Sequence, residues 1–174
     1  PMKKTYLELK KMEKSYKNQF RCFNIALSNR IENTKIFYTN PSSQLSSIAI
    51  NLNKINFLKN KKVKKQNIKT NTLDNFVLKN KKLFEKKIDY IKIDTEGNDL
   101  KVLIGASKTI LKHKPKLIQI EMNYHYLFSG ENLYQFSKLL KGYEVYQIMP
   151  FNNGLLKIDP SRPENNIFHL SNLE

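Results

Sequence analysis

Cysteine and long apolar runs are scarce in this chain of 174 residues. The single cysteine, Cys22, excludes an internal disulfide and fits a reducing compartment, so we expect a cytoplasmic protein. No apolar stretch approaches the length of a bilayer and no signal peptide is visible, so we expect no membrane span. The length and the hydrophobic content of 40% instead favour one globular domain with its own core.

Arginine is also scarce, although the net charge is +16. Only Arg21, Arg30 and Arg162 carry the bidentate guanidinium that specific phosphate and base recognition uses, and lysine supplies the rest of the positive charge. Because the chain is rich in Asn, Ile and Lys throughout, we interpret the charge as compositional bias. We therefore expect no specific nucleic-acid partner, while weak attraction to anionic membrane surfaces or acidic glycans stays open.

The central stretch, residues 88–121, has the pattern of a strand, a crossover helix and a second strand. An apolar strand over 88–93 ends at Asp94 and Glu96, a helical pattern covers 98–113, and a strand over 116–121 ends at Glu121. Such units place their two strands in parallel, with the carboxyl ends at one edge of the sheet. The spacing therefore predicts that these three carboxylates meet in one crevice.

The flanking segments alternate in the same way, which predicts an α/β fold with a largely parallel sheet and an antiparallel hairpin at its edge. An apolar stripe over 2–18 indicates a helix with a core-facing side, and Gly105 indicates close backbone packing where it interrupts its helix. Residues 41–63 indicate a polar insertion, either a solvated loop or a lid. Further helices are expected after Thr72 and over 131–141, and further strands over 20–25, 34–38, 66–70, 143–148 and 166–170.

The run from Ile91 to Ala106, which contains Asp94-Thr95-Glu96-Gly97, resembles the signature of the FkbM family of S-adenosylmethionine-dependent methyltransferases. Shorter segments over 24–28, 72–76 and 118–121 resemble other parts of that family in the same order. The resemblance implies a class I methyltransferase fold, with a Rossmann-like, seven-stranded sheet.

The same resemblance implies that the chain is N-terminally incomplete. The family carries a glycine-rich loop after its first strand and an acid-Pro pair after its second, and only Pro1 resembles part of these features. We therefore expect residues 1–174 to form a single, partial domain that lacks the first strand, first helix and second strand. We expect the chain by itself to bind S-adenosylmethionine too weakly to detect.

The resemblance also implies a reaction, O-methylation, often of sugar hydroxyls in surface polysaccharides or glycolipids. Methyl transfer to a hydroxyl needs an aligned acceptor and a group that takes the proton. Asp94 is the first candidate for that base, or for a ligand to an assisting divalent metal. Glu96 and Glu121 are candidates for binding the acceptor or a metal, and His125 is a further candidate base. The residues that the resemblance places beside the adenine of the cofactor are Ala26, Leu27 and Ser28.

Three other interpretations stay open. Asp94 and Glu96 precede a helix and suit the stabilisation of its exposed N–H groups without any catalytic role. Asp94-Thr95-Glu96 also resembles the Asp-x-Glu motif of magnesium-dependent exonucleases, although those place an antiparallel strand after the motif. Finally, a chain without the glycine-rich loop fits an inactive remnant of a methyltransferase.

Overall fold

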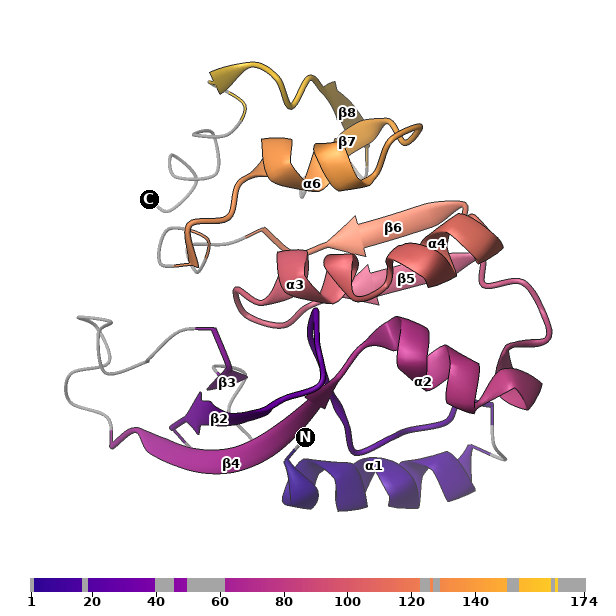
Figure 1. Cartoon of the computed structure of the whole chain (residues 1–174), viewed down its shortest axis with the longest axis vertical. Coiled ribbons are helices and arrows are strands. Elements are labelled where there is room, and N and C mark those ends of the chain that lie inside the picture. The colour runs from indigo at the N-terminus through magenta and orange to yellow at the C-terminus, as the bar shows by residue number, and fades with distance from the viewer. Residues whose placement is uncertain are drawn as a thin grey trace.

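A computed structural model describes residues 2–16, 19–39, 46–49, 62–122, 126, 129–149, 154–163 and 165 (Figure 1). The helices in this part of the chain are α1 (Lys3–Ser15), α2 (Leu73–Lys79), the 3-10 helix η3 (Lys81–Phe84), α3 (Asp99–Ile104), α4 (Ser107–His113) and α6 (Leu133–Leu139). The strands are β1 (Ala26–Leu27), β2 (Asn33–Tyr38), β3 (Ser46–Ser47), β4 (Lys64–Asn71), β5 (Tyr90–Ile93), β6 (Leu117–Ile120), β7 (Val145–Ile148) and β8 (Leu155–Ile158).

The described strands form three sheets, with the orders β1-β4-β2-β3, β5-β6 and β7-β8. β5 and β6 are parallel, with Ile91 opposite Ile118, and β1 is parallel to β4. The other pairs are antiparallel. The expected α/β character is confirmed and so is the parallel central unit, whereas the described strands do not join into one continuous parallel sheet.

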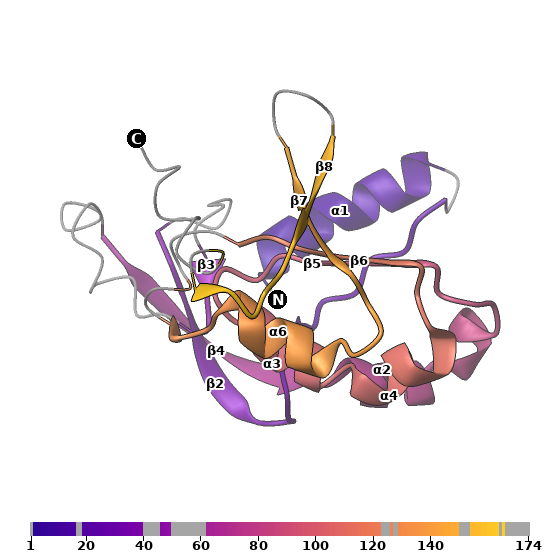
Figure 2. The same ribbon diagram turned by 90° about the horizontal axis from the view of Figure 1, so that it is seen from above.

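The β5–β6 pair lies between two layers of helices (Figure 2). α2, α3, α4 and α6 are on one side of it and α1 is on the other. The core under the first group is built from Ile93 on β5, Val102 and Leu103 on α3, Tyr126, and Phe136 on α6. Burial of these side chains holds the helices against the sheet, since apolar contact area is the main source of stability.

Gly105 divides the long helix expected over 98–113 into α3 and α4. A Cβ atom at this position would lie 2.1 Å from the backbone oxygen of Ser28, so only glycine fits without displacing backbone. The close packing predicted from this glycine is therefore confirmed, and its partner is the chain that leaves β1.

The N-terminal segment contains two wrong predictions. α1 forms as expected, but Met12 and Tyr16 of its apolar stripe are about half exposed, and Glu13 is the buried residue of the helix. Glu13 faces inward because its carboxylate accepts hydrogen bonds from Lys10 Nζ at 2.8 Å and from the backbone N–H of Cys22 at 2.9 Å. Residues 20–25 form no strand, and the short strand β1 follows them instead.

The C-terminal hairpin differs from the prediction in its second strand. β7 pairs with β8 in antiparallel register, as Val145 opposite Ile158 shows. β8 falls in the segment that the sequence indicated as a connection, and the expected strand over 166–170 lies outside the described residues. Most of the insertion over 41–63 also lies outside them, except for residues 46–49 with β3 and residues 62–63. None of the helices described is long and apolar enough to cross a membrane.

Candidate active site

Three carboxylates gather where the two central parallel strands end. Asp94 follows β5 directly and Glu121 follows β6, and the Glu121 N–H donates to the carbonyl oxygen of Ile93 at 3.3 Å. This last bond extends the β5–β6 ladder, so the two acids leave neighbouring strands side by side. Glu96 lies close enough to act on Glu121 electrostatically. Asp94 and Glu121 therefore lie side by side as predicted, with Glu96 within electrostatic reach of Glu121, whereas the predicted crevice stays a prediction.

The electrostatics of this group centre on Glu121. Burial raises the pKa of the Glu121 carboxyl, and a hydrogen bond with Asp94 and the charges of Asp94 and Glu96 raise it further. Lys92 acts in the opposite direction on that pKa, and its Nζ lies 3.1 Å from Asp94 Oδ2. Glu121 therefore holds its proton more tightly than an isolated glutamate does.

The chain between Asp94 and α3 makes a turn with two residues in the left-handed region, Glu96 at φ 55° and Gly97 at φ 92°. Ser47 of β3 donates from Oγ to the carbonyl oxygen of Glu96 at 2.7 Å. Asp99 accepts the N–H of Thr95 on Oδ1 at 3.0 Å and the N–H of Gly97 on Oδ2 at 3.2 Å. These bonds fix a strained backbone, which non-glycine residues adopt only when their surroundings compensate.

A second set of acids lies buried behind this turn. Asp99 is only 1% exposed, and burial raises its pKa. Glu131 accepts the N–H of Leu100 at 3.3 Å, and burial together with the Asp99 charge raises the pKa of Glu131 to about 7. Tyr126 is 6% exposed, and its hydroxyl has no hydrogen-bond partner among the described residues. Burial is the main cause that raises the pKa of Tyr126, followed by the charge of Asp99.

Sequence reasoning missed this buried set. Asp99 lies five residues after Asp94 in the same signature run, and this position was the one sequence feature that could have indicated a role for Asp99. No short-range pattern linked Asp99 to Tyr126 or to Glu131, because the contact depends on how the segment after β6 folds back on α3.

The residues expected beside the cofactor lie at the exit of β1. Ala26 and Ser28 are buried, at 6% and 2% exposure, and Leu27 is half-buried. Asn98, at the start of α3, donates from Nδ2 to the carbonyl oxygen of Leu27 at 3.0 Å. This bond joins the exit of β1 to the turn that follows Gly97. The two predicted halves of the site are therefore in direct contact.

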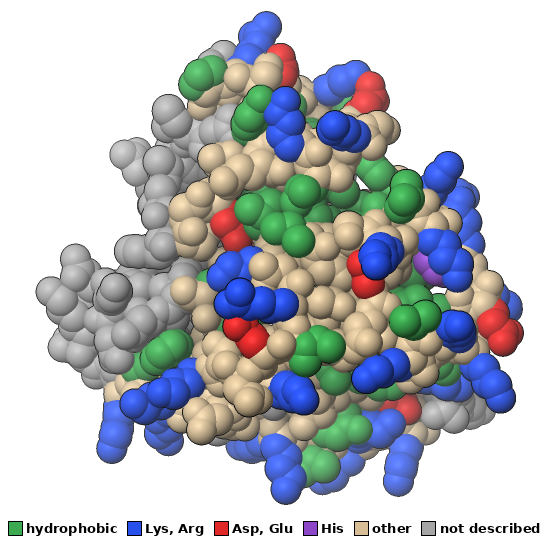
Figure 3. Space-filling view, viewed as in Figure 1, with side chains coloured by type: hydrophobic (Ala, Val, Ile, Leu, Met, Phe, Trp, Pro, Cys, Tyr) green, Lys and Arg blue, Asp and Glu red, His purple; other side chains and the backbone are tan. Residues whose placement is uncertain are grey.

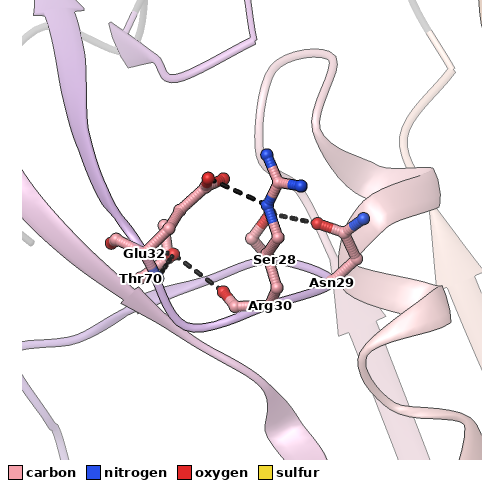
Figure 4. Close-up of polar contacts among 5 residues, drawn as sticks. All are labelled: Ser28, Asn29, Arg30, Glu32 and Thr70. Carbon is pink, nitrogen blue, oxygen red and sulfur yellow. Dashed lines mark hydrogen bonds and ion pairs between the residues drawn. The ribbon is translucent and has the colours of Figure 1, made fainter.

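Thr70 of β4 holds the loop that follows β1 (Figure 4). Its hydroxyl donates to the carbonyl oxygen of Arg30 at 2.8 Å and accepts the N–H of Glu32 at 3.1 Å, and Thr70 is 1% exposed. Arg30 Nε also donates to Glu32 Oε2 at 2.8 Å, and Ser28 Oγ donates to Asn29 Oδ1 at 3.4 Å. The exit of β1 is thus fixed by side chains that leave little freedom to move.

His125, the further candidate base, lies outside the described residues. Within the ranges that the structure describes, no group of three or more His, Cys, Asp or Glu side chains is arranged to hold a metal ion.

The parallel β5–α3–α4–β6 unit, with acids at the carboxyl ends of its strands, defines an α/β protein whose candidate site lies where such sheets bind ligands. The model of the methyltransferase FkbM domain matches residues 2–145, from the start of α1 to the first residue of β7. This chain therefore belongs to the FkbM methyltransferase family, which confirms the resemblance found in the signature run. Neither a search of curated proteins nor a search of solved structures gave a match.

Proposed function

We propose that this protein is an S-adenosylmethionine-dependent O-methyltransferase with a class I, Rossmann-like domain, acting in the cytoplasm on a sugar or another small hydroxyl compound. The observation that carries the proposal is the pairing of Asp94 with Glu121 at the ends of β5 and β6. Membership of the FkbM family supports the transfer of a methyl group. The acid pair supports an acceptor that must lose a proton.

The residues at this edge fit the cofactor in charge and in polarity. A sulfonium is positively charged, and Asp94, Glu96 and Glu121 provide a concentrated negative field for it. The half-buried side chain of Leu27 supplies apolar surface suited to one face of an adenine ring. When bound, the cofactor supplies an electrophilic methyl group.

The acids have distinct roles in this proposal. The Asp94–Glu121 pair would take the proton of the acceptor hydroxyl when that hydroxyl receives the methyl group, and the neutral thioether of the cofactor would be the leaving group. A carboxylate with a raised pKa is a stronger base than a free one, which suits Glu121 for holding that proton. Glu96 lies on the rigid left-handed turn and accepts a hydrogen bond that orients the acceptor.

The test, made with the full-length protein that the family resemblance implies, is transfer of tritium from methyl-labelled S-adenosylmethionine to a panel of sugars and polysaccharide fragments. Asp94→Asn and Glu121→Gln should each lower the rate by about 100-fold, the usual contribution of a positioned base. Asp89→Asn, an exposed acid just before the opposite end of β5, is the matched control and should keep the rate. Unchanged rates in both site variants would overturn the assignment. Absence of labelled product and of cofactor binding in the full-length, unmodified protein would favour the inactive remnant.

The exonuclease alternative has one observation in its favour, the high positive charge, and one against it. The motif is followed by α3, and the next strand, β6, is parallel to β5 rather than antiparallel. Magnesium-dependent degradation of single-stranded DNA that is lost in Asp94→Asn would revive this alternative.

A further inference from the structure

A second concave site lies away from the acidic edge, between α2, η3 and α4. The cavity has a volume of about 540 Å³, which falls within the range of about 300–1,000 Å³ found for small-molecule sites. None of the three carboxylates at the ends of β5 and β6 lines it. Its apolar wall consists of Val77 and Leu78 from α2 and Phe84 from η3. Leu78 is 61% exposed, so an apolar ligand would cover hydrophobic surface that is now in water.

His113, at the end of α4, also lines this cavity, although its Nε2 atom has less than 1 Å² of accessible surface. The side chain is 6% exposed and its Nδ1 accepts the N–H of Ile88 at 3.4 Å. Because Nδ1 is an acceptor, the neutral ring carries its proton on Nε2. This buried Nε2 has no partner among the described residues. A buried donor without a partner is costly, but this nitrogen is covered by the protein and does not face a ligand in the cavity.

Positive charge dominates the remaining lining of the cavity. Lys81 from η3 and Lys108 and Lys112 from α4 all line it. Asp74 also lines it, but its oxygens already accept the N–H groups of Lys108 and Thr109 at 3.0 and 2.7 Å.

Glu85 is the other acid of the lining. The three lysines therefore outnumber the two acids, and the charge of Asp74 is already stabilised by backbone N–H groups. Figure 3 shows Lys and Arg side chains around a small hydrophobic area in the region of α2 and α4.

We propose that this cavity binds a small amphipathic carboxylate, such as a medium-chain fatty acid, with its tail on Leu78 and Phe84 and its head group between the lysines of η3 and α4. The carboxylate oxygens accept hydrogen bonds from the lysine ammonium groups. The charge selects an anion over a neutral or cationic compound with the same tail, and the apolar wall selects it over an inorganic anion.

The experiment follows backbone amide shifts of the isotopically labelled protein while octanoate, octanol or octylammonium is added below its micelle concentration. Octanoate should shift amides of α2, η3 and α4 in a saturable way, and its affinity should fall as salt is added. Octylammonium should leave these amides unchanged, and octanol should bind more weakly than octanoate. Equal effects of all three compounds, or no saturable shift with octanoate, would overturn the proposal.

Variants separate the head-group site from general charge. The double variant Lys108→Gln with Lys112→Gln should weaken octanoate binding roughly fivefold, since each exposed charge pair contributes little. The matched control is the double variant Lys86→Gln with Lys87→Gln, which removes the same charge from exposed positions outside the lining and should keep the affinity.

Leu78→Ser tests the tail contact at an exposed position and should weaken binding without unfolding the protein. Unchanged binding in both the α4 double variant and Leu78→Ser would contradict the assigned site. The amide shifts do not depend on methyl transfer. If the protein showed no methyl transfer but still gave these shifts with octanoate, the proposed carboxylate site would be supported.

Discussion

The exits of two strands, β1 and β5, meet at the candidate site but are built in opposite ways. At β1, Ala26 and Ser28 are buried, and the carbonyl oxygen of Leu27 is bound by Asn98. At β5, Asp94 is exposed and lies near Glu121, whose pKa is raised by desolvation first and then by Asp94 and Glu96. The exit of β1 is closely packed, whereas the exit of β5 holds like charges near one another.

This contrast indicates a division of labour within one site. Groups that repel one another lower stability, so they are retained where they serve binding or chemistry. Groups that are packed and fully bonded supply the rigidity that such a site needs. Substitutions at the β1 exit should therefore affect folding, and substitutions at the β5 exit should affect protonation.

The largest effect should come from Gly105→Ala. The added methyl would lie 2.1 Å from the Ser28 carbonyl oxygen, and relief requires backbone movement at the β1 exit. We expect a loss of about 3 kcal/mol in the free energy of unfolding, measured by urea titration. Gly142→Ala is the control, since it has a positive φ of 89° but no atom within 4 Å, and should cost only about 1 kcal/mol. Equal losses would show that the contact with Ser28 is not tight.

Thr70→Val should have the next largest effect. The change keeps the shape of the side chain but leaves the Arg30 carbonyl and the Glu32 N–H without the Thr70 hydroxyl, in a place that is 1% exposed. We expect a loss of about 2 kcal/mol, measured by thermal or urea unfolding. Thr34→Val, at a half-buried position on the neighbouring β2, is the control and should change stability by less than about 0.5 kcal/mol.

The acids behind the β5 exit should make stability depend on pH. The pKa of Glu131 is about 7 in the folded protein, above its ordinary value of 4.5, so the folded state binds the proton more tightly. The stabilisation that the folded state gains from proton binding at Glu131 is complete below about pH 4.5 and is lost as the pH rises through 7. Because Glu131 is only half-buried, we expect its contribution to be roughly 1 kcal/mol after solvent screening.

Glu131→Gln is the variant that tests this pH dependence, because it removes the titrating group and keeps the shape. The slope of the melting temperature between pH 5 and pH 8 should flatten in this variant relative to the unmodified protein. An unchanged slope would assign the dependence to other groups.

Asp94→Asn should have the smallest effect on stability, under about 0.5 kcal/mol, since Asp94 and its partner Lys92 are both exposed. It should nevertheless lower the pKa of Glu121, because the Asp94 charge is one of the causes that raise it. Carbon-detected titration of the glutamate carboxyl groups measures this directly. Asp89→Asn should leave the pKa of Glu121 unchanged. A fall of the same size in Asp89→Asn would show that the effect of Asp94→Asn is not local.

Elements defined by short-range patterns were predictable from the sequence. The strands at residues 88–93 and 116–121 and the helix opened by Thr72 follow from apolar runs and from an N-cap, whose oxygen accepts the Asn75 N–H at 3.0 Å. The orientation of α1 was not predictable, because the burial of Glu13 depends on Cys22, nine residues further along the chain. The apolar stripe alone predicted that the opposite face of α1 would be buried.

At the candidate site, too, only the contacts that follow from short-range patterns were predictable. The meeting of Asp94 with Glu121 follows from parallel topology, which a strand-helix-strand pattern determines. The links of Ser47 to Glu96 and of Glu131 to Leu100 join segments 49 and 31 residues apart. No periodicity encodes such contacts, so only the folded structure revealed them.

The bond from Ser47 to the Glu96 carbonyl has a consequence for how tightly a ligand can bind. The left-handed turn at Glu96 and Gly97 is ordered by Ser47 and Asp99 during folding, before any ligand arrives. A ligand at the acidic edge therefore loses little affinity to the entropy of ordering this turn, which is the benefit of preorganisation. The insertion that carries β3 thus contributes to affinity through Ser47, a residue that is 1% exposed.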